Sequence, residues 1–348
     1  MDKIKMLFPY KEKEFISSFS RGQRRDWSNT IIKSDTFFTK TKGAGIKVAI
    51  IDTGCAKTHP DLEGAIFDIF NPYSRSWPED RVGHGTHVAG IIGARDNDIG
   101  VVGIAPECQL LIAKGLDDDG FGDWNKIVAC IQWSVHQCAD VINLSLGDMR
   151  EPPQLVHETI KWAVGKGVII IAAAGNDPNS TPSRPTKLDV AYPARYDEVI
   201  SVAAIDKNGN LAYFSNRGKI LNFLAPGVDI FSTYPLDKYA ILTGSSQASP
   251  MISGICALLK AADKEKMKNY KDAIFSLNEI STKNDAIAKI TKNYNIGIPS
   301  FSNISIQSIG EYVDEKFDEE IAKKLDTFDW KWTGNKMKSK SMDIMWIV

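Results

Sequence analysis

The sequence predicts an α/β fold in three layers, with a mostly parallel central sheet and helices on both faces. Short continuous apolar runs are typical of parallel strands that are buried on both sides. Here such runs alternate with longer segments of helical character, which is the pattern of a parallel sheet covered on both faces. The expected strands are 47–51, 110–114, 141–146, 168–174 and 199–204, and the expected helices are 88–94, 124–137, 155–165 and 246–259.

Size and charge suit one large domain with additions. The chain has 348 residues, of which 43% are hydrophobic, and its formal net charge is −1. Nothing in this balance favours nucleic acid or an anionic membrane as a partner. The longest apolar run, near 168–175, is too short to span a bilayer.

Cysteine usage and the N-terminus predict a cytoplasmic protein. The chain has five cysteines, an odd number, and they lie in or beside apolar segments. We interpret them as reduced core residues. The first residues contain no apolar stretch long enough for a signal peptide.

Asp52 ends the first predicted strand and is followed by Thr53 and Gly54. Open α/β sheets place their chemistry at the carboxyl ends of strands. A simple turn is the alternative interpretation of this Asp-Thr-Gly segment. His84, between Gly83 and Gly85, precedes a helix of small apolar residues.

Ser246 opens a further predicted helix, after Gly244 and before Pro250. A helix N-terminus offers unpaired amide donors and a positive dipole end, which suit a developing oxyanion. A capping role for Ser246 and a nucleophilic role for Ser245 are the alternatives. A serine nucleophile needs an imidazole to accept its proton and a carboxylate to orient that imidazole.

The segments 48–54, 83–90 and 244–250 closely resemble the three signatures of the subtilisins, in the same chain order Asp, His, Ser. The resemblance covers about residues 40–304. It implies a subtilisin-like fold and a catalytic triad of Asp52, His84 and Ser246, with Asn176 supplying a side-chain donor to the oxyanion. Two residues depart from the usual pattern, because Ser245 replaces threonine and Gln247 replaces methionine.

The resemblance also assigns a substrate cleft and a calcium site. The substrate would bind as an added strand between the segments Gly120, Phe121, Gly122 and Ser145, Leu146, Gly147. Carboxylates near these segments favour a cationic substrate side chain. For Ca²⁺ the resemblance implies the side chains of Asp61 and Asn97 and main-chain oxygens of Arg95, Ile99 and Val101, an oxygen-only set. The ligand that the family takes from its N-terminal segment is not assigned.

A narrower resemblance concerns the N-terminus. The segment 7–10, Leu-Phe-Pro-Tyr, is similar to a motif of the intracellular subtilisins, whose N-terminal extension lies across the active site and keeps the enzyme latent. We therefore expect an N-terminal extension at 1–39, inhibitory over about its first twenty residues, and a catalytic domain at 40–306. A tail at 307–348 contains an amphipathic stretch at 309–325, which predicts a helix.

The function expected is that of a cytoplasmic serine endopeptidase that acts on protein or peptide substrates through an acyl-enzyme and is latent until its N-terminus is processed. A peptidase dedicated to one precursor and an inactive peptide-binding relative are the alternatives. A calcium ion is the expected cofactor. Neither nucleic acid nor membrane is an expected partner, and a homodimer is compatible with the tail.

Overall fold

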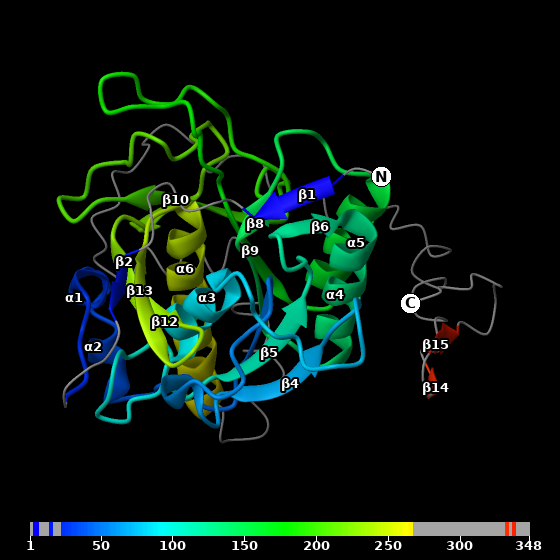
Figure 1. Cartoon of the computed structure of the whole chain (residues 1–348), viewed down its shortest axis with the longest axis horizontal. Helices are drawn as coiled ribbons and strands as arrows, with labels where there is room; N and C mark the ends of the chain where they lie inside the picture. The colour runs from blue at the N-terminus through cyan, green and yellow to red at the C-terminus, as the bar shows by residue number, and fades with distance from the viewer. Residues whose placement is uncertain (1–2, 7–13, 17–21, 267–330, 334–335, 339–348) are drawn as a thin grey trace.

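Seven parallel strands form the centre of the molecule in the computed structural model (Figure 1). The structure describes residues 3–6, 14–16, 22–266, 331–333 and 336–338. In sheet order the strands are β11 (Phe223–Pro226), β10 (Ile200–Ile205), β9 (Ile169–Ala173), β7 (Val141–Leu144), β3 (Lys47–Asp52), β5 (Gln109–Lys114) and β4 (Ile66–Phe70). The predicted parallel sheet is confirmed.

Helices cover both faces of this sheet, as expected. Along β3, Val48 and Ile50 contribute to one apolar core, whereas Ala49 and Ile51 contribute to the other. Helices α3 (His84–Gly93) and α6 (Ser245–Lys266) pack on the first face. Helices α4 (Trp124–His136) and α5 (Gln154–Gly165) pack on the second (Figure 1). Alternating side chains of each buried strand therefore supply two separate cores.

The structure corrects the predicted strand 141–146. Strand β7 ends at Leu144, and Leu146 and Gly147 form β8 in a second sheet. Ser145 lies between them and donates from Oγ to the Ser246 carbonyl at 2.9 Å. That carbonyl lacks its usual helical partner because Pro250, four residues further on, has no N–H. The break in the strand thus places a hydroxyl where the α6 backbone needs a donor.

Helix boundaries differ at two further places. Helix α3 begins at His84 rather than at residue 88, and α6 runs from Ser245 to Lys266. Ser246 therefore lies in the first turn of α6, inside the helix rather than at its flanking cap position. This location excludes the interpretation of Ser246 as a simple N-cap residue.

The N-terminal residues add strands to two smaller sheets. Strand β1 (Lys3–Met6) lies between β6 (Phe121–Asp123) and β8, antiparallel to both (Figure 1). Strand β2 (Glu14–Ile16) pairs with β13 (Lys238–Leu242), which itself pairs with β12 (Ile230–Tyr234). The expected inhibitory segment 7–10 lies outside the described residues.

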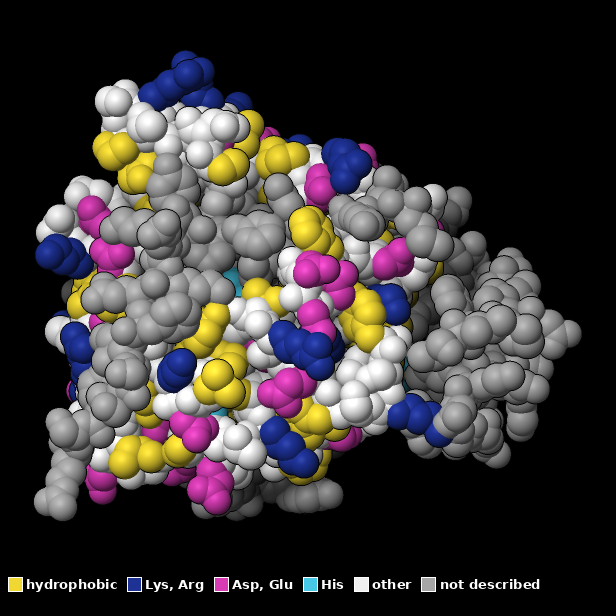
Figure 2. Space-filling view, in the orientation of Figure 1, with side chains coloured by type: hydrophobic (Ala, Val, Ile, Leu, Met, Phe, Trp, Pro, Cys, Tyr) yellow, Lys and Arg dark blue, Asp and Glu magenta, His cyan; other side chains and the backbone are white. Residues whose placement is uncertain are grey.

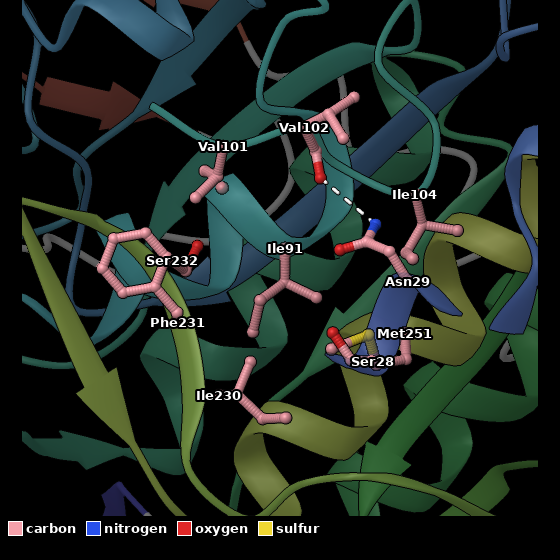
Figure 3. Close-up of a pocket in the computed structure, with 11 residues that line it drawn as sticks. Ser28, Asn29, Ile91, Val101, Val102, Ile104, Ile230, Phe231, Ser232 and Met251 are labelled. Atoms are coloured by element: carbon pink, nitrogen blue, oxygen red, sulfur yellow. Dashed lines mark hydrogen bonds between the residues drawn. The ribbon is translucent and has the colours of Figure 1, made fainter. Parts of the chain in front are cut away.

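Residues from Asp26 onward pack against the rest of the described fold. Helix α1 (Trp27–Ile32) borders a small buried cavity, where Asn29 Nδ2 donates to the Val102 carbonyl at 3.3 Å (Figure 3). Asp26 Oδ2 accepts from Ser28 Oγ at 3.1 Å and from the Phe231 amide at 3.4 Å. Helix α2 (Asp35–Phe38) follows α1. The segment from Asp26 onward therefore belongs to the core structure.

The predicted helix at 309–325 lies outside the described residues. The described part of the tail is an antiparallel hairpin, β14 (Lys331–Thr333) and β15 (Lys336–Lys338). Within the described residues no helix is both long and apolar enough to cross a membrane. On the face shown in Figure 2, acidic and basic side chains are interspersed.

Candidate active site

Asp52 and His84 form a buried hydrogen-bonded pair at the carboxyl end of the central strand β3. Asp52 Oδ1 lies 2.8 Å from His84 Nδ1, and both side chains are about 1% exposed. The same carboxylate oxygen accepts from the Thr53 amide at 2.7 Å. His84 Nε2 is buried and has no hydrogen-bond partner within the described part of the chain. The ring is thus oriented by the carboxylate and has an opposite nitrogen that is able to accept a proton.

A second buried carboxylate, which the sequence reasoning missed, shapes the loop before His84. Asp80 Oδ1 accepts from the Gly83 amide at 2.6 Å and from Thr53 Oγ1 at 2.8 Å. Asp80 Oδ2 accepts from the amide and the hydroxyl of Thr86, at 2.7 and 2.6 Å. Asp80 therefore joins the start of α3 to the residue after Asp52. No signal beyond its position between two motifs could have identified it.

Close packing explains the glycines on either side of His84. Gly83 has φ +91°, and a Cβ on it would lie 2.1 Å from the Tyr234 ring. A Cβ on Gly85 would lie 2.2 Å from the Gly54 carbonyl oxygen and 3.2 Å from Asp52 Cβ. Only glycine, which has no Cβ, lets helix α3 with His84 approach strand β3 with Asp52 this closely.

Ser246 and Ser245 have different partners. Ser246 Oγ is fully buried and donates to the Ser145 carbonyl at 3.1 Å. Ser245 Oγ accepts from the Gly175 amide at 3.1 Å and so joins α6 to the end of β9. This structural role of the Ser245 hydroxyl favours Ser246 as the nucleophile. Helix α6 packs against α3, which carries His84 (Figure 1).

Asn176 stands directly beside this helix start. Its Oδ1 accepts from the Ser245 amide at 2.9 Å. This bond orients the carboxamide, so that its NH₂ end is turned away from Ser245. Gly175, with φ +108°, makes the turn that brings Asn176 there, and a Cβ on it would lie 2.5 Å from Asn216 Nδ2. The arrangement suits a donor for an oxyanion at Ser246.

The two predicted substrate segments lie on either side of β1. Lys5 is opposite both Phe121 and Gly147, Ile4 is opposite Gly122, and Met6 is opposite Leu146. The Ile4 side chain is fully buried in the core that includes Leu146. A Cβ on Gly122 would lie 3.0 Å from Ile4 Cγ2, so this strand leaves no space for a larger residue.

A comparison with protein families matches residues 43–297 to the subtilase family of peptidases. The chain is 38% identical over 268 residues to an intracellular serine protease of Paenibacillus polymyxa, covering 75% of this chain and 79% of that protein. It is 40% identical over 245 residues to the major intracellular serine protease of Bacillus subtilis strain 168, covering 68% and 76%. Subtilisin DY of Bacillus licheniformis is 44% identical over 221 residues, covering 63% and 77%.

The chain belongs to the subtilase family. The predicted resemblance is confirmed, and the protein is a serine-type endopeptidase of the subtilisin type.

Asp61 contacts the loop 95–101, which carries the other predicted calcium ligands of this subtilase. Asp61 Oδ2 accepts from the Val101 amide at 2.8 Å and from the Tyr239 hydroxyl at 3.0 Å, whereas Asp61 Oδ1 is buried and has no hydrogen-bond partner among the described residues. Burial raises the pKa of the Asp61 carboxyl. Asn97 Oδ1 accepts from the Ile99 amide at 3.2 Å. A buried carboxylate oxygen with no donor is what a bound cation would satisfy.

Gln23 also contacts this loop, which the sequence reasoning did not predict. Its Nε2 donates to the main-chain oxygens of Arg95, at 2.7 Å, and Val101, at 3.1 Å. The adjacent Arg24 amide donates to the Gly100 carbonyl at 2.6 Å. Gln23 thus contacts the loop from the N-terminal segment, and nothing around it in the sequence indicates this contact.

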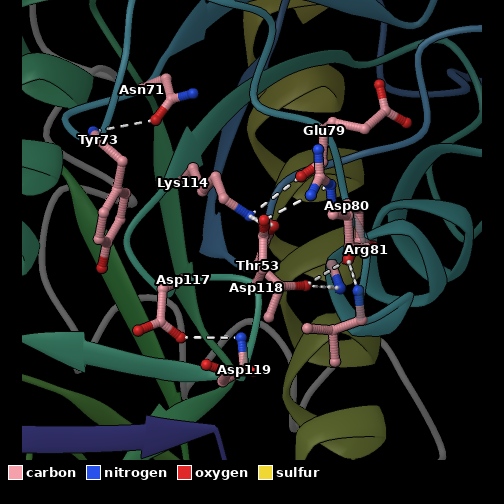
Figure 4. Close-up of polar contacts among 12 residues, drawn as sticks. Thr53, Asn71, Tyr73, Glu79, Asp80, Arg81, Lys114, Asp117, Asp118 and Asp119 are labelled. Atoms are coloured by element: carbon pink, nitrogen blue, oxygen red, sulfur yellow. Dashed lines mark hydrogen bonds and ion pairs between the residues drawn. The ribbon is translucent and has the colours of Figure 1, made fainter.

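Three carboxylates near the predicted substrate segments of the subtilase are paired with bases. Asp118 contacts Lys114 at 3.0 Å and Arg81 at 3.5 Å (Figure 4). Asp148 contacts Arg150 at 3.2 Å, and Asp189 contacts Arg195 at 3.4 Å. These pairs weaken the field that a cationic substrate side chain would experience, and so they reduce the expected preference for such side chains.

Proposed function

We propose that this subtilase hydrolyses peptide bonds through an acyl-enzyme. Ser246 Oγ attacks the carbonyl carbon and its proton passes to His84 Nε2, while Asp52 keeps the other ring nitrogen protonated. The Ser246 amide and Asn176 Nδ2 donate to the oxyanion. His84 then gives the proton to the leaving amine, and water repeats the sequence to release the acid. The buried Asp52–His84 pair, with its opposite nitrogen available to accept a proton, is the observation that carries this proposal.

A fluorophosphonate reagent tests the nucleophile directly. Intact-mass analysis of the full chain is expected to show a single adduct, absent from Ser246→Ala and retained by Ser245→Ala. The Ser245 variant is a matched control because its hydroxyl accepts from the Gly175 amide. Because a latent wild type would label slowly, the full-length Ile4→Asp variant, in which β1 is expected to leave the cleft, is treated in the same way. If both chains stay unlabelled under conditions that label a known serine protease, the proposal is contradicted and an inactive peptide-binding relative is the remaining interpretation.

We further propose that the N-terminal extension makes the enzyme latent. Strand β1 pairs with both β6 and β8, between which a substrate strand is expected to bind. A chain docked as an added strand competes with any substrate that uses the same main-chain groups. The intramolecular contact gives it a high effective concentration. Latency is thus a consequence of the order of strands in this small sheet.

We place the bond whose cleavage frees the extension within residues 17–22. Strand β1, which lies between β6 and β8, and strand β2, which pairs with β13, both lie before this stretch. Gln23, Arg24 and Asp26 lie after it and are hydrogen-bonded to the catalytic domain. Cleavage here would release both strands while retaining the anchored segment.

We also propose that the enzyme works inside the cell. Two of the relatives are named as intracellular serine proteases. All five cysteines of this chain are free thiols, and four of them are buried. Such thiols persist in a reducing compartment.

We propose a structural Ca²⁺ held by Asp61 Oδ1, Asn97 Oδ1 and the carbonyls of Arg95, Ile99 and Val101. Gln23 would turn its carboxamide so that Oε1 replaces the NH₂ group that now donates to two of these carbonyls. The orphaned Asp61 Oδ1 supports the fit. The ion would stabilise the loop and the start of the anchored N-terminal segment, and it would take no part in the chemistry.

Removal of calcium with EGTA is expected to lower the melting temperature by on the order of 5–10 °C, because a ligand that binds only the folded state stabilises it. Gln23→Ala and Asp61→Asn should reduce this difference. Asp98→Asn, on an exposed side chain of the same loop, is the matched control and should retain it. A melting temperature of the wild type that does not respond to EGTA would contradict the site.

A further inference from the structure

Gln247, the residue after the candidate nucleophile, carries a carboxamide that is buried without hydrogen bonds. Its side chain is fully buried, and neither Nε2 nor Oε1 has a partner in the part of the chain that the structure describes. Its polar neighbours along α6 are different. Ser245 Oγ accepts from Gly175, and Ser249 Oγ is paired with Ser145 Oγ. Buried amides in folded proteins are normally hydrogen-bonded, so this one requires an explanation.

The carboxamide lies beside the candidate oxyanion donor. A Cβ built on Gly244 would be 3.0 Å from Asn176 Nδ2 and also 3.0 Å from Gln247 Oε1. Two side-chain amides, one after β9 and one in the first turn of α6, therefore approach the same side of Gly244. The Ser246 amide lies 3.7 Å from the same point. This is the place where the main-chain and side-chain donors of the site come together.

The two carboxamides differ in what fixes their orientation. Asn176 is held by the bond from the Ser245 amide to its Oδ1. Gln247 has no such bond, and a half-turn about its last side-chain torsion exchanges oxygen and NH₂ without breaking one. Gln247 is consequently able to turn its Nε2 donor toward this side of Gly244 when a negatively charged oxygen forms there.

We propose that Gln247 is a second side-chain donor to the oxyanion, acting beside Asn176 and the Ser246 amide. The inference rests on the proposed function, because it requires acyl transfer at Ser246. Gln247 takes no part in bond making. It donates one hydrogen bond from Nε2 to the former carbonyl oxygen while that oxygen carries charge, and the bond weakens again when the carbonyl re-forms. His84 Nε2 is buried in the same unpartnered state, as expected for groups whose partner is the reacting substrate.

The test compares Gln247→Leu, Gln247→Met and Gln247→Glu with wild type, as full-length chains, on a short peptide p-nitroanilide. The Leu and Met variants keep a similar volume without a donor and are expected to lower kcat about tenfold, with KM within twofold. A docked N-terminal strand competes with substrate and so affects KM rather than kcat. For a peptide aldehyde, whose adduct places an oxygen at the same position, Ki should rise by the factor that kcat falls. The Glu variant should lose progressively more activity as its carboxyl ionises with rising pH.

Gln154→Leu, on the exposed start of α5, is the control substitution and should leave kcat unchanged. A packing role alone predicts that Gln247→Leu or Gln247→Met raises the melting temperature and leaves kcat and the aldehyde Ki within twofold of wild type. That result would overturn the inference while the labelled Ser246 still supports the proposed function. Absence of fluorophosphonate labelling in both the wild type and the Ile4→Asp variant would overturn both.

Discussion

His84→Ala is expected to lower kcat by a factor on the order of 10⁶, the loss known for removal of the catalytic histidine in a subtilisin. Without the imidazole nothing accepts the Ser246 proton, and Asp52, which is buried against the ring, has no group to orient. The measurement is kcat for a peptide substrate across pH. The residual rate should increase with hydroxide concentration, because solvent base is then the only acceptor.

His136→Ala provides the control for this loss. His136 lies in the last turn of α4, with an exposed hydrogen bond to the Gln132 carbonyl. Its replacement should leave kcat unchanged. An His84→Ala enzyme that keeps more than about one hundredth of the wild-type kcat would show that a different group serves as the base, since general-base catalysis contributes at least about that much.

Ile4→Asp is expected to raise the initial activity of the full-length chain at least tenfold. Ile4 is fully buried at the centre of β1, and burial of an unpaired carboxylate costs several kcal/mol, far more than the roughly 1.4 kcal/mol that corresponds to a tenfold change. The strand would therefore leave the cleft between β6 and β8. Initial rates on a peptide substrate measure the effect, with intact mass confirming that the extension is still attached.

Leu236→Asp is the matched control, because Leu236 is 81% exposed and the same change there should have no effect on activity. The double variant Ile4→Asp with Ser246→Ala should be inactive, which assigns the gain to the proposed nucleophile. Equal initial rates for wild type and Ile4→Asp, both with the extension intact, would show that β1 does not control access to the cleft.

The sheet and the candidate site were predictable where the signal is local. Strand β3 is a continuous apolar run that ends in Asp52, and its observed bounds extend the prediction by one residue. The strand 141–146 was wrong because the sequence does not show where a chain leaves one sheet for another. Apolar character continues through Leu146, yet β8 pairs with β1 rather than with the central sheet.

By itself the sequence determined the parallel α/β architecture, the order Asp52, His84, Ser246 and the glycines that let their segments approach. These properties depend on side-chain type and spacing within short segments, so they can be predicted without knowledge of the tertiary structure. Only the tertiary structure placed β1 between β6 and β8, brought Gln23 to the loop that contacts Asp61, and gave Asp80 its role. It also left the Gln247 carboxamide without a hydrogen-bond partner among the described residues. Each of these depends on residues that are distant in the chain and meet only after folding. Whether a polar group is satisfied depends on all the neighbours that surround it, which no local pattern records.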